Sequence, residues 1–302
     1  MQNNVPRKIT IHEVVLRDGI QNEKKLVSTE EKVKLINDLI DCGVRRIEVS
    51  SFVNPRLVPQ MADAEELWNT ISRKKGVVYA ALVLSEKGLE RAIQCEVPHV
   101  GIYVSASETH SRKNSNMSII QALVEARRLI DKAHGAGMEV RAGVMNVFGC
   151  AYEGKVPAGK VIPLVKDFMK GEPDEICLAD TSGMANPRQV QNLLRQVQDI
   201  ADSVPISLHL HNTRGLGLAN VWAAVNEGVF IFDSSLGGLG GCPFIPGARG
   251  NIATEDTVNM LNEAGVKTGI NLDKLIETSL QFEQYMGQKF TATVSHLKPS
   301  PR

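Results

Sequence analysis

Two histidines separated by one residue, in the segment SLHLHNT, have the spacing of a metal-binding pair. Side chains two residues apart on a β-strand project from the same face, so His209 and His211 could share one ion. Asp18 and Asn251 could add a carboxylate and an amide oxygen to this pair. Such a mixed nitrogen and oxygen set suits Mg²⁺ or Mn²⁺ and could also accept Co²⁺ or Zn²⁺. The alternatives are a hydrogen-bonded core histidine and, for an aspartate before glycine, a turn residue.

Arg17 stands directly before Asp18 and could supply a positive charge beside the metal. Its guanidinium does not deprotonate, so it could stabilise an enolate oxygen or bind a carboxylate. The alternative is a salt bridge to Glu48 or Asp180. Both roles can coexist, because a carboxylate often orients a group of this kind.

Cys242 lies in the glycine-rich segment LGGLGGCPFIPGARGN (236–251). Glycines beside a single cysteine suggest a loop that closes over substrate and delivers the thiol, which could then act as an acid–base group or a nucleophile. A glycine-rich loop could instead cradle phosphate, but this segment lacks the lysine and the spacing of a P-loop. The remaining alternative is a buried small apolar residue.

The elements that must position these residues follow a repeating pattern. Short β-branched runs alternate with longer amphipathic stretches, such as 29–43 and 186–204, which indicates repeated βα units. The strand-like runs cover residues 9–15, 45–52, 77–84, 99–106, 139–148, 175–182, 205–212 and 230–237. Eight units in about 270 residues fit a closed barrel better than the alternative, a doubly wound open sheet.

We therefore predict an α/β fold with one domain, residues 1–302. A (β/α)₈ TIM barrel would cover about residues 8–270, and a short C-terminal helical extension and tail about residues 271–302. The active site of such a barrel lies at the C-terminal ends of its strands. The polar residues named above end the predicted strands or follow them, so we expect them to meet at that face.

The composition excludes several classes of partner. The 34 basic and 34 acidic residues cancel, and no basic stripe is interleaved with aromatic residues, so nucleic acid and membranes are not expected partners. The five cysteines show no paired spacing, which fits a reducing compartment. With no apolar leader and no run of 18 apolar residues, we expect a soluble, cytoplasmic protein. Lys24 could still meet a nucleotide phosphate, or it could be a solvated surface residue.

Taken together, these segments resemble the metal-dependent 3-hydroxy-3-methylglutaryl-CoA (HMG-CoA) lyases of the Asp-Arg-Glu TIM-barrel superfamily. The matching segments span nearly the whole chain in the order of the family. They are LRDGIQNE (16–23), IEVSSFVNPRLVPQMAD (47–63), SASETHSRKN (105–114), LADTSGMANP (178–187), HLHNTRGLGLAN (209–220) and GGLGGCPFIPGARGNIATED (237–256).

The resemblance implies retro-Claisen cleavage of HMG-CoA to acetyl-CoA and acetoacetate, as in leucine degradation. Arg17 would stabilise the enolate of the departing acetyl-CoA, and Cys242 would protonate it. The hydroxyl proton would pass to His209 or to a metal-bound water. The implied metal ligands are Asp18, His209, His211 and Asn251. The implied supporting residues are Glu48, Asp180, Glu255 and Gln21, and Arg17, Lys24 and Arg214 are assigned to binding the acyl-CoA. Family habit also implies a homodimer or a higher homo-oligomer.

One segment departs from the family pattern. The family usually continues its second histidine with Asp-Thr-Tyr-Gly-Gln, whereas this chain has Asn212 and then Thr213-Arg214-Gly215-Leu216. Asparagine at this place is typical of isopropylmalate and homocitrate synthases, but those synthases carry further C-terminal domains and lack the lyase cysteine. The reaction type therefore stays with the lyases, whereas the acyl group of the substrate is open because Arg214 could alter the mouth of the site. The alternatives are a related lyase acting on another 3-hydroxyacyl-CoA and a Claisen-condensing acyltransferase of the isopropylmalate synthase type.

Overall fold

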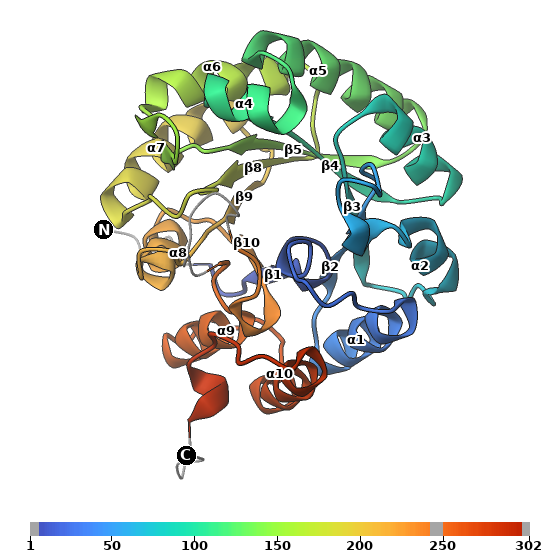
Figure 1. The fold of residues 1–302 in the computed structure, drawn as a ribbon. Helices are drawn as coiled ribbons and strands as arrows, with labels where there is room; N and C mark the ends of the chain where they lie inside the picture. Colours follow the sequence, from blue (N-terminus) through green and yellow to red (C-terminus); the bar gives the residue numbers. More distant parts are fainter. Residues whose placement is uncertain (1–5, 242–249, 298–302) are drawn as a thin grey trace.

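The computed structural model describes residues 6–241 and 250–297, and its centre is a closed barrel of parallel strands in the order β1-β10-β9-β8-β5-β4-β3-β2 (Figure 1). The eight barrel strands are β1 (Thr10–Glu13), β2 (Arg46–Ser51), β3 (Val78–Val83), β4 (His99–Ser105), β5 (Glu139–Met145), β8 (Glu175–Ala179), β9 (Ile206–His209) and β10 (Ile231–Ser234). Each lies within one of the eight predicted runs. The barrel fold is therefore confirmed.

Helices surround the barrel on its outer side (Figure 1). They are α1 (Thr29–Cys42), α2 (Ala64–Thr70), α3 (Glu86–Gln94), α4 (Glu108–Ser115), α5 (Ile119–Gly135), α6 (Ala158–Met169), α7 (Pro187–Ala201), α8 (Gly217–Asn226), α9 (Thr254–Glu263) and α10 (Leu272–Met286). Shorter elements are η1 (Val15–Gly19), η2 (Pro59–Met61), η3 (Leu236–Gly238), η4 (Val294–His296) and the hairpin β6 (Gly149–Cys150) and β7 (Gly154–Lys155). Within the described ranges, no helix combines the length and apolar character needed to cross a bilayer.

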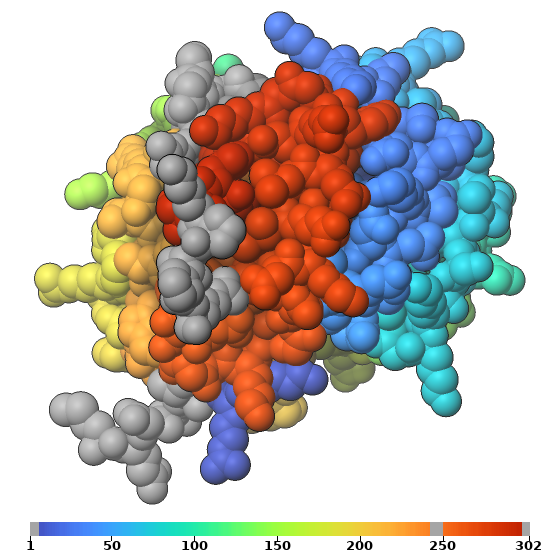
Figure 2. Space-filling model, turned by 90° about the horizontal axis from the view of Figure 1, so that it is seen from below, coloured from blue at the N-terminus to red at the C-terminus, as the bar shows by residue number. Residues whose placement is uncertain are grey.

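The predicted C-terminal extension is α10, which lies beside α1 and covers the barrel where its last and first units meet (Figure 2). The adjoining helix α1 shows how local sequence sets such elements. Ser28 caps its start by accepting a hydrogen bond from the Glu31 amide (3.3 Å), and Gly43 ends it with a left-handed φ of 106°. The predicted amphipathic stretch 29–43 therefore coincides with α1 and its C-terminal glycine, and the N-cap lies one residue before it.

All eight barrel strands end before their predicted runs do, and the corrections to the runs 9–15 and 205–212 affect how candidate site residues are placed. The run 9–15 is a strand only to Glu13, after which the chain enters the π-helical turn η1. The run 205–212 ends at His209, where pairing with the neighbouring strands stops. His211 instead forms an isolated bridge with Asn251, because the segment returning from the glycine-rich loop pairs with the chain there.

Candidate active site

Arg17 and Asp18 lie on η1, the single π-helical turn that follows β1. The wider spacing of this turn is visible in the hydrogen bond from the Gly19 amide to the Val14 carbonyl (3.1 Å). Glu13 supports the turn by accepting a hydrogen bond from the Val15 amide (2.9 Å). Single π-turns are rare and occur frequently at functional sites. This one directs two adjacent charged side chains to the wall of the cavity at the barrel mouth.

Asp18, His209 and His211 form a cluster that could hold a metal ion. One ligand atom from each residue lies within 4.8 Å of the others. The Nε2 atoms of the two histidines are 3.0 Å apart, and each lies 3.8 Å from Asp18 Oδ2. Two ring nitrogens and a carboxylate oxygen aimed at one point are a normal donor set for a divalent cation. The predicted pairing of these three residues is therefore present, and the set fits a metal.

Asn251 joins this cluster through its amide. Its Nδ2 donates hydrogen bonds to Asp18 Oδ2 (2.7 Å) and to the Leu239 carbonyl (3.0 Å). Its Oδ1 is buried and has no hydrogen-bond partner among the described residues. A buried amide oxygen without a partner is costly unless another group satisfies it. The site thus contains a free oxygen donor of the type that hard divalent cations prefer, and the ligand role of Asn251 stays a prediction.

The neighbouring groups keep the Asp18 carboxyl ionised. Burial raises the pKa of the Asp18 carboxyl, but the Arg17 guanidinium and the two histidines outweigh this effect and hold that pKa well below its ordinary value. Burial lowers the pKa of His209, whereas its hydrogen bond to Asp233 and the charge of Asp18 raise it to a net value above the ordinary one. The carboxylate is therefore ionised across the physiological pH range and available as a ligand.

Arg17 is held between two carboxylates. Its Nε donates to Glu48 Oε2 and its Nη1 donates to Asp18 Oδ1, both at 2.5 Å. Burial lowers the pKa of the guanidinium, but the charges of Glu48 and Asp18 raise it above its ordinary value overall. Of the two salt bridges considered from the sequence, the one to Glu48 is therefore confirmed. Arg17 keeps a fixed orientation at the cavity wall, as a group that stabilises developing charge must.

Two predicted supporting residues, Asp180 and Gln21, lie in or beside the walls of the site. Asp180 is fully buried and accepts hydrogen bonds from the amides of Met184 (2.9 Å) and Ala185 (3.2 Å), so it shapes the loop after β8. Burial raises the pKa of Asp180, and these backbone donors counteract the rise only in part. Gln21 lines the cavity, where its Nε2 lies 3.3 Å from Asp18 Oδ1.

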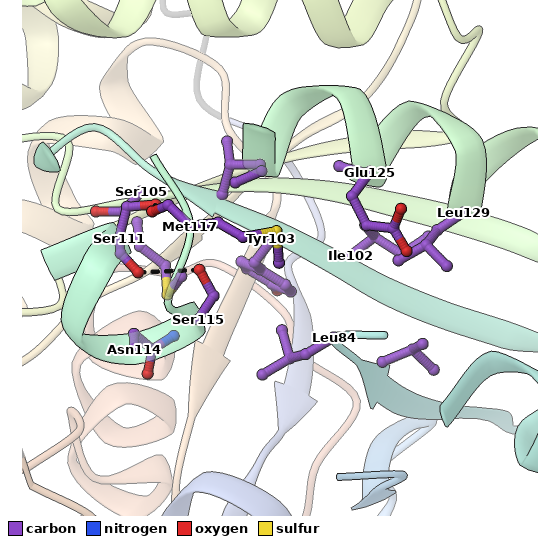
Figure 3. A pocket seen from close by; sticks show the side chains of 15 residues that line it. Leu84, Ile102, Tyr103, Ser105, Ser111, Asn114, Ser115, Met117, Glu125 and Leu129 are labelled. Carbon is purple, nitrogen blue, oxygen red and sulfur yellow. Dashed lines mark hydrogen bonds between the residues drawn. The ribbon is translucent and has the colours of Figure 1, made fainter. Parts of the chain in front are cut away.

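The cavity between these residues has a volume of about 280 Å³. One wall carries Arg17 and the candidate metal ligands Asp18, His209 and His211, and α4 contributes His110 and Asn114. A second, smaller hollow of about 30 Å³ lies between α4, α5 and β4, large enough for a water molecule. Figure 3 shows Asn114 on one side of this hollow, Glu125 on the other and Tyr103 between them. Both spaces are lined by Tyr103 and Asn114.

The described parts of the glycine-rich segment lie against the metal cluster. Gly240 has a φ of 89°, and a Cβ atom there would lie 2.6 Å from the Asp18 carbonyl oxygen. Only glycine therefore lets this backbone approach so closely. Cys242, the predicted acid, lies outside the described residues. Further back, Glu255 is buried and accepts the Gly237 amide hydrogen bond at 3.0 Å, so it supports the segment from behind.

Glu13, at the end of β1, connects the turn η1 to the segments that follow β10. Its Oε1 accepts hydrogen bonds from the amides of Val15 and Leu236, each at 2.9 Å, and its Oε2 lies 2.7 Å from Thr254 Oγ1. The side chain is fully buried, and this burial raises its pKa to about 8 despite these hydrogen bonds. Glu13 is therefore mainly neutral in the folded protein near neutral pH.

Replacing Glu13 with glutamine is expected to remove a pH dependence of stability. Between about pH 4.5 and 8 the unfolded state releases this proton while the folded state keeps it, so wild-type stability falls as pH rises through that window. Once this carboxyl is fully ionised in the unfolded state, the free energy of unfolding of the wild type is lower by roughly 5 kcal/mol. Glutamine mimics the neutral carboxyl and does not ionise, so the stability of the variant relative to the wild type should increase as pH rises. Urea unfolding at pH 5 and pH 8 measures this; parallel pH profiles for the two proteins would contradict it.

Two predicted acyl-CoA contacts do not line the cavity. Lys24 and Arg214 are both exposed, and neither is among the residues that surround the space beside the metal cluster. Their role in binding the substrate stays a prediction. The unusual Asn212 has a structural role, because its Oδ1 accepts a hydrogen bond from the Gly217 amide (3.0 Å) at the start of α8.

Sequence reasoning missed several residues that the fold brings to the site: Glu13, Tyr103, His110, Asn114 and Asp233. A signal existed for two of them. Glu13 and Asp233 are acidic residues within predicted strands, and a buried carboxylate in a strand needs a specific partner. The cavity residues of α4 gave no such signal, since a polar helix after a strand also suits a solvated surface.

Comparison with known proteins agrees with this geometry. A family model described as HMGL-like matches residues 8–281. The chain is 43% identical over 283 residues to hydroxymethylglutaryl-CoA lyase YngG of Bacillus subtilis, a match that covers 94% of this chain and 95% of that protein. The crystal structure of the Bacillus subtilis HMG-CoA lyase has a TM-score of 0.93 at 42% identity, covering 96% of this chain and 98% of that one. An HMG-CoA lyase from Acinetobacter baumannii in complex with coenzyme A and 3-methylmalate has a TM-score of 0.92 at 39% identity, with coverage of 100% and 99%.

Proposed function

Since this chain belongs to the HMGL-like family, we propose that it is a divalent-metal-dependent lyase that cleaves HMG-CoA to acetyl-CoA and acetoacetate. The observation that carries the proposal is the convergence of Asp18, His209 and His211 beside the fixed guanidinium of Arg17. A related lyase was solved with coenzyme A, which supports an acyl-CoA substrate. The oxygen-containing donor set favours Mg²⁺ or Mn²⁺ as the ion.

The cleavage has three steps, namely deprotonation of the hydroxyl, breaking of the carbon–carbon bond and protonation of the enolate, and its protons and electrons balance. The 3-hydroxyl loses its proton, the bond between C2 and C3 breaks, and the electron pair of that bond passes to the thioester as an enolate. The enolate then takes up a proton to give acetyl-CoA, and the former hydroxyl carbon becomes the ketone of acetoacetate. A divalent ion held by the cluster would act as a Lewis acid toward the substrate oxygen.

The residues of this chain supply the remaining steps. Arg17, oriented by Glu48, places its positive charge where the enolate oxygen develops. Cys242 would deliver the proton to the enolate carbon, as the resemblance to the HMG-CoA lyases implies. His209 is a ligand rather than the base, because its Nδ1 lies 3.0 Å from Asp233 and its Nε2 faces the cluster. Neither ring nitrogen is then free to accept the hydroxyl proton, so that proton would pass to water at the ion site, the other acceptor considered.

Incubating the purified protein with HMG-CoA and MgCl₂ or MnCl₂ tests this function directly. Acetoacetate and acetyl-CoA should form in equal amounts, and protein stripped with a chelator should form neither. Absence of acetoacetate above the stripped control would contradict the proposal. Cleavage of a different 3-hydroxyacyl-CoA, or release of free CoA from acetyl-CoA plus a 2-oxo acid, would identify one of the two alternative reactions.

Replacing Cys242 with serine is expected to lower kcat by roughly 10²- to 10⁴-fold, the usual contribution of a positioned acid. Serine keeps the size of the side chain but is a far weaker acid than a thiol. Metal affinity should not change. The matched control is Cys95→Ser, because Cys95 is a buried free thiol beyond the end of α3 and outside the cavity lining. Unchanged turnover in Cys242→Ser would contradict the acid role.

A cytoplasmic location and a homodimeric or higher assembly stay predictions for this protein. Relatives with the same activity name include both a Bacillus subtilis protein and mitochondrial proteins, so the family name alone does not assign a compartment. Light scattering on the purified protein would give its assembly state.

A further inference from the structure

A layer of charged side chains fills the barrel next to the metal cluster. Asp233 on β10 and His209 on β9 are register partners in adjacent parallel strands, and His12 on β1 is the partner of Asp233 on the other side. Register partners share a face, so all three side chains point into the barrel. Each of them is buried, with exposures of 1% for Asp233, 7% for His209 and 1% for His12.

Asp233 contacts His209 on the ring nitrogen that faces away from the cluster. His209 Nδ1 lies 3.0 Å from Asp233 Oδ2, while His209 Nε2 lies toward His211 and Asp18. One carboxylate thus reaches a candidate metal ligand from behind. Ligating histidines commonly have such a partner, which sets the tautomer and the angle of the ring.

Arg141 determines which group donates in this contact. Its Nη1 donates to Asp233 Oδ2 (3.0 Å) and its Nη2 to Asp233 Oδ1 (2.7 Å), so both oxygens act as acceptors. A guanidinium has no acceptor and keeps its protons. The hydrogen bond from His209 must therefore be donated by Nδ1–H. This arrangement leaves the Nε2 lone pair of His209 directed into the cluster.

Arg141 is itself held from several sides. It forms an ion pair with Glu175 Oε1 (2.7 Å), donates to Ser207 Oγ (2.9 Å) and lies 3.0 Å from His12 Nδ1. The side chain is 1% exposed. A bidentate carboxylate–guanidinium pair fixed in this way resists rotation, because any movement would leave buried charges without partners.

The second histidine of the cluster has no equivalent support. His211 Nδ1 is buried and makes no hydrogen bond to any described residue. The two candidate ligands therefore differ, although they share one ion site. The orientation of His209 depends on a charged pair in the barrel interior, whereas that of His211 depends on the backbone bridge to Asn251.

We propose that Asp233, anchored by Arg141, is a positioning residue of the metal site that holds His209 in the tautomer with Nε2 free for the ion. The inference rests on the metal site of the proposed function but not on the identity of the acyl substrate. It assigns Asp233 no contact with substrate.

The test compares the variants Asp233→Asn and Glu175→Gln. Both remove one carboxylate charge beside Arg141, so both disturb the charged layer, but only Asp233 touches His209. Titration with Mn²⁺, with the free ion followed by electron paramagnetic resonance, gives the affinity without any turnover. Asp233→Asn should weaken Mn²⁺ binding by about 10- to 100-fold, and Glu175→Gln should stay close to the wild type. Equal weakening by both variants, or no change in Asp233→Asn, would overturn the proposal.

A measurement on the wild-type protein covers the case in which Asp233→Asn does not fold. In Mg²⁺-loaded protein with ¹⁵N-labelled histidine, the His209 ring should carry its proton on Nδ1, and a proton on Nε2 would overturn the proposal. If the protein does not cleave HMG-CoA but the variants show the expected Mn²⁺ affinities, the proposed function is contradicted and this inference is supported. Failure of the wild type to bind Mn²⁺ would contradict the inference itself.

Discussion

Replacing Arg17 with glutamine is expected to lower kcat for HMG-CoA cleavage by about 10³-fold, while the metal still binds. Arg17 is buried, fixed by Glu48 and directed to the cavity that contains the metal cluster. Glutamine can donate a hydrogen bond but carries no charge, so the enolate oxygen would develop in a buried site without its counter-charge. Steady-state kinetics with HMG-CoA measures the loss.

The Arg17→Gln experiment needs a metal titration beside the kinetics, because Arg17 also contacts Asp18 at 2.5 Å. If Arg17 stabilises the reacting oxygen, saturating metal should not restore turnover. If excess Mn²⁺ restores it, Arg17 acts only by holding Asp18, and the catalytic assignment is wrong. Arg195→Gln is the matched control, since Arg195 forms an exposed ion pair with Glu227 on the outer helices.

Replacing His211 with alanine is expected to lower turnover at a fixed, low Mn²⁺ concentration by roughly 10³-fold, as a metal contribution of several kcal/mol implies. His211 is a cleaner deletion than His209. Its Nδ1 has no hydrogen-bond partner in the described part of the chain, whereas removing His209 would delete one of the hydrogen bonds that the buried Asp233 accepts. Loss of metal binding and loss of activity should therefore occur with little loss of stability.

The measurement for His211→Ala combines Mn²⁺ titration, turnover and urea unfolding. Partial recovery of turnover at high Mn²⁺ would confirm that the defect is metal affinity. Full activity at low Mn²⁺ would contradict the ligand role of His211. The control is His134→Ala on α5, which removes a partly exposed histidine that lies 3.1 Å from Asp174 and outside the cavity lining.

The barrel was predictable because its cause is local and repeated. Each βα unit places an apolar run beside an amphipathic helix, and eight such units leave few other ways to bury those faces. The metal cluster was predictable for a related reason. Two histidines two residues apart in a predicted strand are expected to share a face, and they do so here although the strand ends at His209 and His211 lies in an isolated bridge. The barrel topology brings Asp18 on the first unit close to the seventh strand.

The ends of the strands were not predictable to the residue. Nothing in VVLRDG distinguishes a strand that continues to residue 15 from one that ends at Glu13 and turns. That choice depends on Glu13 accepting hydrogen bonds from both the Val15 amide and the distant Leu236 amide. Likewise, Asn251 reaches Asp18 only because the backbone at Gly240 passes within contact of it.

The amino-acid sequence by itself determined the barrel and the identities of Arg17, Asp18, His209 and His211 as a candidate site, because periodicity and spacing are properties of short segments. Only the tertiary structure decided the surroundings of that site. It showed that Arg17 pairs with Glu48, that Asp233 stands behind His209, and that Arg141 determines the direction of the hydrogen bond between them. These contacts join residues 24 to 92 positions apart. Burial and partner choice at such separations arise only when the closed barrel brings its strands together.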